Sequence, residues 1–478
     1  MSDTQLNDLK DWNNPVWQGQ AREDFLATIQ RHRLIAWHVS AVCFLAYSIL
    51  ALAMSVLLSP LVYGVWTLLL DLINFLWPTP SIWPDFLFSA SSEGAVKLSG
   101  TQVLAGLVGV GLALLGGLVL MAWIGYNLAQ ALRQGQWVHT TLSTRPVDET
   151  SLPEQQFKNT LAEMALAAAI PVPPIKVVAG VANAALISHG DITAGVLVGE
   201  DLIKRLDRRQ LQGVSAHLIA SLAENDLKVG LHISTMLGVL AWLARFAVSL
   251  MDAQQRPERL KLLRAVFRRD ANSRALLHTY LLEPVVQAKP NAAQSQYKIK
   301  FTWREWLLLP LLGPFVIGVL AALLINYFIL SPLVALAWRQ RKYMADASAV
   351  KLTREPNGLA SALGLLTAEN NTLLVSAWAS HFCLVQPSNI NPSLFSLFPP
   401  LEKRLQALVL LGADASVLSS TRIASGGLSQ FFPYLGTVFV AGLIVLFIPL
   451  IVQLSLMLSL IFTVIPFSLL HSLLRALA

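Results

Sequence analysis

The chain has 478 residues, of which 55% are hydrophobic and only 13% are charged. This balance is too apolar for an ordinary soluble protein and predicts an integral membrane protein. The formal net charge of +7 comes without a basic stripe interleaved with aromatic residues, so we expect no nucleic acid partner and attribute the excess to Lys and Arg on cytoplasmic segments.

The N-terminal quarter of the chain predicts a polar segment followed by a membrane hairpin. Residues 1–34 lack the basic start and short apolar core of a cleaved signal peptide. Region 35–132 contains two apolar runs, each long enough to cross a bilayer of about 30 Å as a helix. The loop between the runs has Lys97 as its one basic residue, which places the loop outside the cell and both ends of the hairpin inside.

Region 133–430 has the mixed composition of a globular domain, although membrane or interfacial helices interrupt it. A helix over 154–169 is stopped by Ile170-Pro-Val-Pro-Pro174, since proline removes a donor and fixes φ. Three short apolar segments bounded by Gly and Asp turns predict strands over 175–178, 184–188 and 195–198. A short helix then runs from Glu200 to Leu206, and Asp207 is placed to N-cap the next one.

The middle of this region leaves the membrane topology open. If the apolar segments 233–251 and 306–338 both crossed the membrane, the basic helical insertion 252–305 between them would lie outside, against the positive-inside rule. Arg245 weakens the first of these helices, so we favour a partial or interfacial insertion. Helices over 341–352 and 359–366 follow, and 431–478 predicts a C-terminal membrane hairpin.

The helix that follows Asp207 carries the strongest hint of chemistry. Residues i and i+4 share one side of a helix, which is how two histidines four apart with a glutamate between them hold a catalytic zinc. Here the first position is His217, the glutamate position is Leu218 and the second histidine position is Ser221. Taken alone, a single histidine on an apolar helix is more often a core residue than a ligand.

Several segments, in order, resemble the HtpX-type integral-membrane zinc metallopeptidases, the gluzincin group that also contains the eukaryotic CAAX prenyl endopeptidase. The resemblance covers roughly residues 150–410. It implies a mostly α integral membrane protein that contains an α+β metallopeptidase-like domain with a small sheet. The matching segments are Glu154 to Pro173, the edge-strand start Asn183-Ala184, the zinc-helix lead-in Leu211 to His217, Asp226, the third-ligand segment Arg339 to Thr353, Ser380-His381-Phe382, and Phe398-Pro-Pro-Leu-Glu-Lys-Arg404.

The departures from the family pattern fall on the residues that perform catalysis. The resemblance places the catalytic base at Leu218 and the zinc ligands at His217, Ser221 and Lys342. Leucine cannot accept a proton, serine is a poor zinc donor and an ammonium repels the ion, whereas a catalytic zinc needs three protein ligands and a base. We therefore expect no catalytic residue, no metal and no cofactor.

Residues around the former metal position remain candidates for a structural role. The resemblance retains Asp226, Asp346 and His381 as residues that would support the ligands, and we expect Lys342 to pair with Asp226 or Asp346 in place of a metal. Glu224 cannot rebuild the zinc site, because it lies seven residues beyond His217, about 10 Å along the helix. Cys43 and Cys383 allow neither a disulfide framework nor a cysteine zinc cluster.

These observations predict a membrane pseudopeptidase that works as a binding or scaffolding subunit. The edge strand at Asn183, Ala184, Ala185 and Leu186 could capture an extended peptide, since main-chain pairing needs no metal. The expected partners are the lipid bilayer and a protein or peptide, and the expected location is the bacterial inner membrane, with the peptidase-like domain on the cytoplasmic side.

Two other interpretations stay open at this point. One is an active membrane zinc metalloendopeptidase with unorthodox ligands, the one reading under which zinc would be a cofactor. The other is a channel or transporter. Against it, the membrane runs contain few of the charged residues that mark ion or substrate paths, Asp71 and Arg245 being the main exceptions.

Overall fold

A computed structural model describes the part of the chain that carries the metallopeptidase-like segments. The described residues are 24–48, 143–189, 193–233, 330–367, 380–386, 397–414 and 416, with scattered positions between 111 and 130 and between 235 and 273. The chain forms two compact units. The first comprises residues 1–39, 138–230 and 335–430, and the second comprises 40–137, 231–334 and 431–478.

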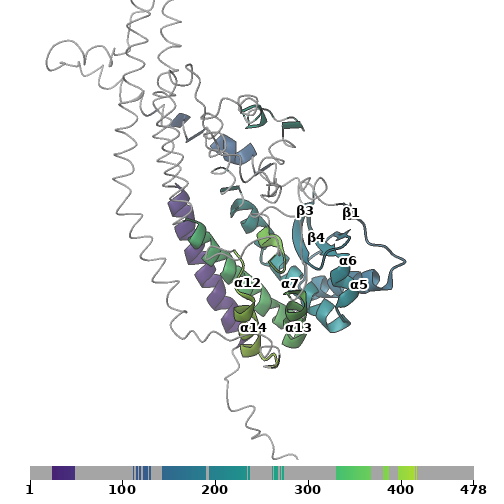
Figure 1. The fold of residues 1–478 in the computed structure, drawn as a ribbon. Helices are drawn as coiled ribbons and strands as arrows, with labels where there is room; N and C mark the ends of the chain where they lie inside the picture. Colours follow the sequence, from purple (N-terminus) through teal and green to yellow (C-terminus); the bar gives the residue numbers. More distant parts are fainter. Residues whose placement is uncertain are drawn as a thin grey trace, which may run out of the picture. The chain divides into compact units, whose positions relative to one another are not determined.

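The first unit is built on a four-stranded mixed sheet with the strand order β1-β2-β4-β3 (Figure 1). Strand β2 (Ile175–Val178) runs parallel to β4 (Thr193–Gly199) and antiparallel to β1 (Thr144–Arg145). Strand β3 (Ala184–His189) pairs antiparallel with β4 and closes the order on one side. The strands predicted over 175–178, 184–188 and 195–198 are therefore present, with β3 and β4 one to two residues longer at their ends.

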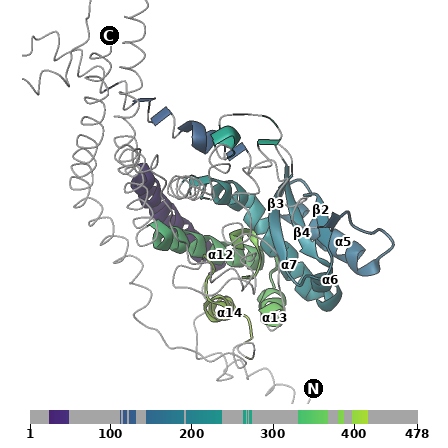
Figure 2. The same cartoon turned by 45° about the horizontal axis from the view of Figure 1, so that its top comes forward.

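Helices pack beside this sheet through their apolar faces. Helix α7 (Arg208–Ala223) lies between the sheet and α13 (Pro356–Thr367) in both views of the fold (Figures 1 and 2). Helix α7 also contacts α5 (Leu152–Ala167), and α13 contacts α14 (Leu401–Leu410). The short helix α6 (Glu200–Arg205) follows β4 directly. Fully buried apolar side chains between these elements form the core: Phe157, Leu161, Leu197, Leu202, Leu211, Leu218, Ile219 and Trp338.

Local signals in the sequence explain where most helices begin and end. Helix α5 has proline in its first turn, where the missing N–H costs nothing, and it ends before Ala169, whose φ of 53° is left-handed. Helix α7 begins at a capping box. The Asp207 side chain accepts a hydrogen bond from the Gln210 backbone N–H, and the Gln210 side chain accepts one from the Asp207 backbone N–H. The predicted N-cap at Asp207 is confirmed.

Helix α12 differs from the prediction. A helix was expected from Arg341, after an apolar membrane run that ended at Trp338, but α12 extends from Ser331 to Thr353 without interruption. The reason is that Pro332 lies in its first turn and no breaker follows before Arg354, whose φ of 59° ends the helix. Helix α13 likewise begins at Pro356, three residues earlier than predicted.

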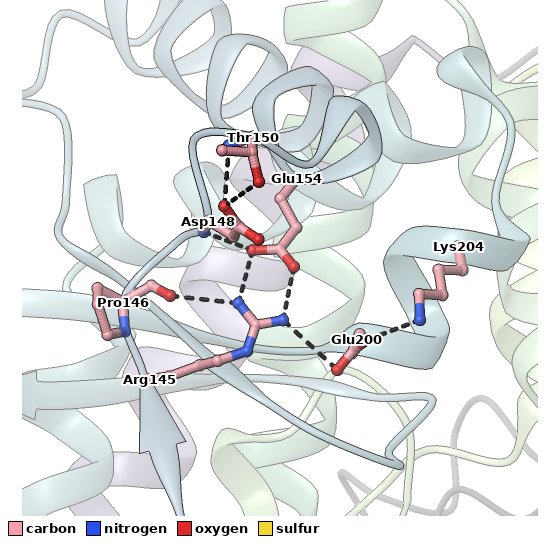
Figure 3. A network of polar contacts seen from close by, with 7 residues as sticks. All are labelled: Arg145, Pro146, Asp148, Thr150, Glu154, Glu200 and Lys204. Atoms are coloured by element: carbon pink, nitrogen blue, oxygen red, sulfur yellow. Dashed lines mark hydrogen bonds and ion pairs between the residues drawn. The ribbon is translucent and has the colours of Figure 1, made fainter.

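A charged network joins β1 to α5 and α6 (Figure 3). Arg145 donates to both carboxylate oxygens of Glu154, at 2.6 and 2.9 Å, and lies 3.4 Å from Glu200. The Asp148 N–H also donates to Glu154, at 2.8 Å. The hydrogen bond from Arg145 outweighs burial and lowers the pKa of Glu154. This network anchors the two-residue strand β1, which the sequence did not predict.

A helix over residues 25–48 approaches α12 through its first turns. Ile29 packs with Met344 and Ala347, and His32 lies 2.6 Å from Gln340 and stacks on the Tyr343 ring. This helix begins earlier than the predicted membrane run from residue 35. None of the described helices is both long enough and apolar enough to cross a membrane. Several predicted parts of the chain lie outside the described residues. They are the loop between the two N-terminal apolar runs, most of 233–251, 252–305 and 306–338, and all of 431–478.

We expect the close approach of α7 and α13 at Gly213 to control the stability of the first unit. A Cβ atom at Gly213 would lie 2.5 Å from the Leu359 backbone nitrogen, so Gly213→Ala must push the helices apart. The expected loss is about 3 kcal/mol in the free energy of unfolding, as for other overpacked sites. Gly364→Ala in α13 is the matched control: no atom lies within 4 Å, so the helix should gain about 0.5–1 kcal/mol. Chemical unfolding followed by circular dichroism measures both, and equal effects would contradict this account.

Candidate functional site

The candidate site is formed where α7, α12 and α14 meet. His217, Leu218 and Ser221, the three positions of the zinc helix pattern, all lie in α7 and are at most 2% exposed. Lys342 and Asp346 project from α12 and are also buried. The structure therefore brings the predicted ligand positions into one enclosed region.

A buried carboxylate organises the charged groups of this site. Nδ1 of His217 lies 2.8 Å from Oδ1 of Asp346. On its other side Asp346 accepts two hydrogen bonds from Arg404 of α14, from Nε at 2.8 Å and from Nη2 at 2.7 Å. The guanidinium and the carboxylate thus form a bidentate pair, the strongest geometry available to these two groups. One carboxylate connects three helices.

The environment sets the protonation of this pair. Burial opposes ionisation of Asp346, but the charge and hydrogen bonds of Arg404 more than offset burial and hold the pKa of Asp346 well below its usual range. Burial lowers the pKa of His217 to about 4, although Asp346 acts in the opposite direction. At neutral pH the imidazole is therefore neutral. Because an ionised carboxylate only accepts, we assign the proton to Nδ1, which leaves Nε2 with a lone pair.

The Lys342 side chain, at the third ligand position, bonds to the backbone. Its Nζ donates to the carbonyl oxygen of Cys383 at 2.8 Å and lies 5.8 Å from the centre of the Phe398 ring. Burial, reinforced by repulsion from Arg404, lowers the pKa of Lys342 to about 8. An unshifted lysine would be more basic, so this ammonium is held in a region that disfavours positive charge.

The predicted ion pair of Lys342 with an aspartate is replaced by two arginine pairs. Asp346 is paired with Arg404, and Asp226 accepts from Nε of Arg341 at 2.5 Å. Burial raises the pKa of Asp226 despite the opposing charge of Arg341. Among the described residues, no ion pair joins Lys342 to either carboxylate. The reason is geometric. Arg341 and Arg404 each place rigid N–H donors on one carboxylate, and Lys342 donates to a backbone carbonyl instead.

Two further candidates lie apart from this cluster. The ring of His381 packs edge-on against Trp338 with 4.7 Å between centroids, and the His381 carbonyl accepts from the Trp338 indole. Glu224 pairs with Arg33 at 2.6 Å, while its backbone carbonyl accepts from Arg341. These contacts place His381 in an aromatic cluster and turn Glu224 toward helix 25–48.

The edge strand β3 begins beside the site. Asn183, at 0% exposure, donates from Nδ2 to the carbonyl of Val385 at 2.8 Å and accepts from the Val385 N–H at 3.2 Å. The N–H of Leu384 donates to the Ala184 carbonyl at 2.7 Å, and Ala185 forms an antiparallel bridge with Cys383. The outer edge of Ala184 and Ala185 therefore carries a segment of the same chain.

Comparison with known proteins identifies the family of this chain. Residues 151–411 match the model of a family described as Peptidase family M48. The chain belongs to peptidase family M48. It is 30% identical over 258 residues to a "Protease HtpX homolog" of Dictyoglomus turgidum, covering 53% of this chain and 68% of that protein. It is 26% identical over 303 residues to the protein of the same name from Listeria monocytogenes strain HCC23, covering 62% and 86%.

Among solved structures, the crystal structure of S. mikatae Ste24p is similar over 57% of this chain and 53% of its own, with 17% identity and a TM-score of 0.31.

The residues at the three positions predicted for the zinc ligands do not fit a catalytic zinc. Nε2 of His217 is buried with no hydrogen-bond partner in the described residues, so one nitrogen donor is available. The other two positions hold a neutral hydroxyl and an ammonium, and the base position holds a buried leucine. Within the described residues, no group of three His, Cys, Asp or Glu could hold a metal. Zinc needs three such donors and an open position.

Arg404 and Arg341 are the residues of this site whose contacts the sequence did not predict. Arg404 appears in the closing family segment, but nothing in the order of residues places it against Asp346, 58 positions away. One signal could have found it: a buried aspartate requires a cationic partner, and Lys342 alone could not serve both Asp226 and Asp346.

We expect removal of the Arg404 guanidinium to destabilise the site more than removal of the whole ion pair. Arg404→Met would leave the Asp346 carboxylate buried beside a neutral imidazole, at a cost of about 3–5 kcal/mol in the free energy of unfolding. The double variant Arg404→Met/Asp346→Leu removes the uncompensated charge and should recover at least half of the loss. Denaturant unfolding of the parent, the two single variants and the double variant is the measurement, and additive losses in the double variant would refute the pairing.

We expect His217 to make the fold sensitive to mild acid. Between pH 6.5 and about 4 the unfolded chain binds a proton on His217 that the folded chain does not, so stability falls as pH falls through this window. The loss approaches about 3 kcal/mol at pH 4. His217→Asn keeps a donor for Asp346 but cannot titrate, while Asp346, Arg404 and Lys342 stay as they are. The stability curves of the two proteins should therefore diverge below pH 6.5, and parallel curves would contradict the assignment.

Proposed function

We propose that this chain is a membrane-attached member of family M48 that has lost proteolysis and serves as a binding or scaffolding subunit. The observation that carries the proposal is the side chain at the third ligand position. The Lys342 ammonium bonds to a backbone carbonyl, and a cation cannot ligate zinc. Together with Leu218 at the base position, it removes both metal and proton acceptor from the reaction.

The retained parts of the site support binding rather than decay. Arg404 donates two hydrogen bonds to Asp346 at 2.8 and 2.7 Å, Nδ1 of His217 lies 2.8 Å from the same carboxylate, and Asp226 has an arginine partner. Each buried aspartate of the site has an arginine partner, which holds this region in one defined geometry. The peptide-binding element of the proposal is the edge strand at Asn183, Ala184, Ala185 and Leu186, by strand addition.

Attachment to a membrane is proposed from the apolar runs of the sequence. Runs 35–58, 103–132, 306–338 and the 431–478 hairpin have the length and composition of membrane helices. We place the protein in the bacterial inner membrane with the peptidase-like domain on the cytoplasmic side, where Lys and Arg collect. The partners would be the bilayer and a protein or peptide of that compartment.

The alternative is an active zinc metalloendopeptidase with unorthodox ligands. One observation favours it, namely the buried Nε2 of His217, which has no hydrogen-bond partner in the described part of the chain and could still donate to a metal. Against it, Ser221 and Lys342 would have to be replaced by donors from elsewhere, and a site with fewer than three good donors retains zinc weakly.

We expect purified full-length protein to contain substoichiometric zinc after dialysis and to cleave casein no faster than the His217→Ala variant. The reason is that, in the part of the chain that the structure describes, neither a tetrahedral donor set nor a general base is present around His217. Elemental analysis and a gel-based cleavage assay are the measurements. Stoichiometric zinc together with casein cleavage that disappears in His217→Ala would establish the active alternative instead.

A further inference from the structure

The first half of the edge strand is already paired. Strand β3 has β4 on one side, and its opposite side at Ala184 and Ala185 faces the segment Cys383–Val385. The Leu384 N–H donates to the Ala184 carbonyl at 2.7 Å, and the side chain of Asn183 both donates to and accepts from Val385. This segment, here called the resident strand, makes the antiparallel contacts that an added peptide would make.

Each carbonyl of the resident strand accepts from a buried side chain. Lys342 donates to Cys383, Arg404 to Leu384 and Asn183 to Val385, all at 2.8 Å. The three donors are at most 4% exposed, and they come from three different parts of the chain. A segment that only filled space would not require three directed donors, two of them charged.

The resident strand passes the predicted third ligand position. A zinc peptidase polarises the carbonyl of the peptide bond it cleaves, so that carbonyl must point at the metal and its ligands. Here the Cys383 carbonyl accepts from Lys342, the side chain at the third ligand position, while the next residue pairs with Ala184 of the edge strand. The cation of Lys342 thus contacts the resident strand where a metal would contact a substrate carbonyl.

We infer that the resident strand Cys383–Val385 occupies the peptide-binding edge of β3 in cis, and that an external peptide can pair with Ala184 and Ala185 only after this strand leaves. The inference rests on the proposed peptide-binding function and adds its regulation. Lys342, Asn183 and Arg404 hold the edge closed, so weakening any of their bonds to the resident strand opens it. Arg404 also pairs with Asp346, which leaves Lys342 and Asn183 as the residues to vary.

Cys383 gives a direct readout of whether the edge is closed. Its thiol is free and fully buried, and in a Cys43→Ser background it is the one cysteine of the chain. We expect N-ethylmaleimide to label it slowly in the full-length protein. Lys342→Met and Asn183→Ala each remove donors to the resident strand and should raise the labelling rate about tenfold or more.

The matched control for this labelling is Ser215→Ala. It removes a buried hydrogen bond to Thr160 between α5 and α7, away from the resident strand, and should leave the rate unchanged. Fast labelling of Cys383 in the parent protein, or no increase in both Lys342→Met and Asn183→Ala, would overturn the inference.

A synthetic peptide tests exchange at the edge. The probe is fluorescein-labelled Ser-His-Phe-Ser-Leu-Val-Gln, which copies residues 380–386 with serine in place of cysteine. Val385→Pro removes the N–H that donates to Asn183 and still allows an extended backbone at Leu384. We expect the probe to bind the Val385→Pro protein about tenfold more tightly than the parent protein, as measured by fluorescence anisotropy. The same peptide with N-methyl leucine should bind more weakly, because it cannot donate to Ala184.

The two proposals fail in different ways. Equal affinity of the probe for the parent and Val385→Pro proteins would overturn the resident strand and leave peptide binding at the edge standing. Rapid labelling of Cys383 in Val385→Pro without binding of the probe would mean that an open edge takes no peptide. That result would overturn the proposed peptide-binding function, and the exchange with it.

Discussion

The arrangement of the site depends on one buried carboxylate. One carboxylate oxygen of Asp346 lies beside His217 of α7. Both of its oxygens accept hydrogen bonds from Arg404 of α14. The arginine keeps the carboxylate ionised, so the Nδ1 proton of His217 faces an acceptor. Burial keeps the imidazole neutral, although the carboxylate favours its protonation. Three helices that are distant in sequence are thereby held in one geometry.

The charges around the carboxylate explain why a lysine can stand at a ligand position. In an M48 peptidase a zinc ion would supply positive charge here, and its removal would leave two buried aspartates short of cations. This chain supplies Lys342, Arg341 and Arg404 against Asp226 and Asp346, which is one cation more than the carboxylates need. The excess donors go to backbone carbonyls at Cys383, Leu384 and Glu224. Arg404 thus links the buried Asp346 to the resident strand, to which Lys342 also donates.

The sequence predicts well whatever is decided locally. The three strands of the sheet core are short apolar segments between Gly and Asp turns, and the N-cap of α7 is a short-range hydrogen bond, so both could be located in advance. The start of α12 was misplaced because hydropathy changes at Trp338 while helix-forming tendency does not. Strand β1 has two residues and depends on the Arg145–Glu154 pair, which gives no periodic signal.

Contacts between distant residues set the limit of prediction at the site. Family resemblance located His217, Lys342 and Asp346, but their partners are Arg404 and the backbone of Cys383, which no spacing rule connects to them. The resident strand shows the limit most clearly. Asn183 and Val385 are 202 positions apart, and the Asn183 side chain bonds to the backbone of Val385, whose side chain plays no part in these bonds. An edge strand inferred from sequence is only a row of available donors and acceptors. Whether that row is free depends on the rest of the fold, and here Lys342 and Asn183 donate to the segment that covers it.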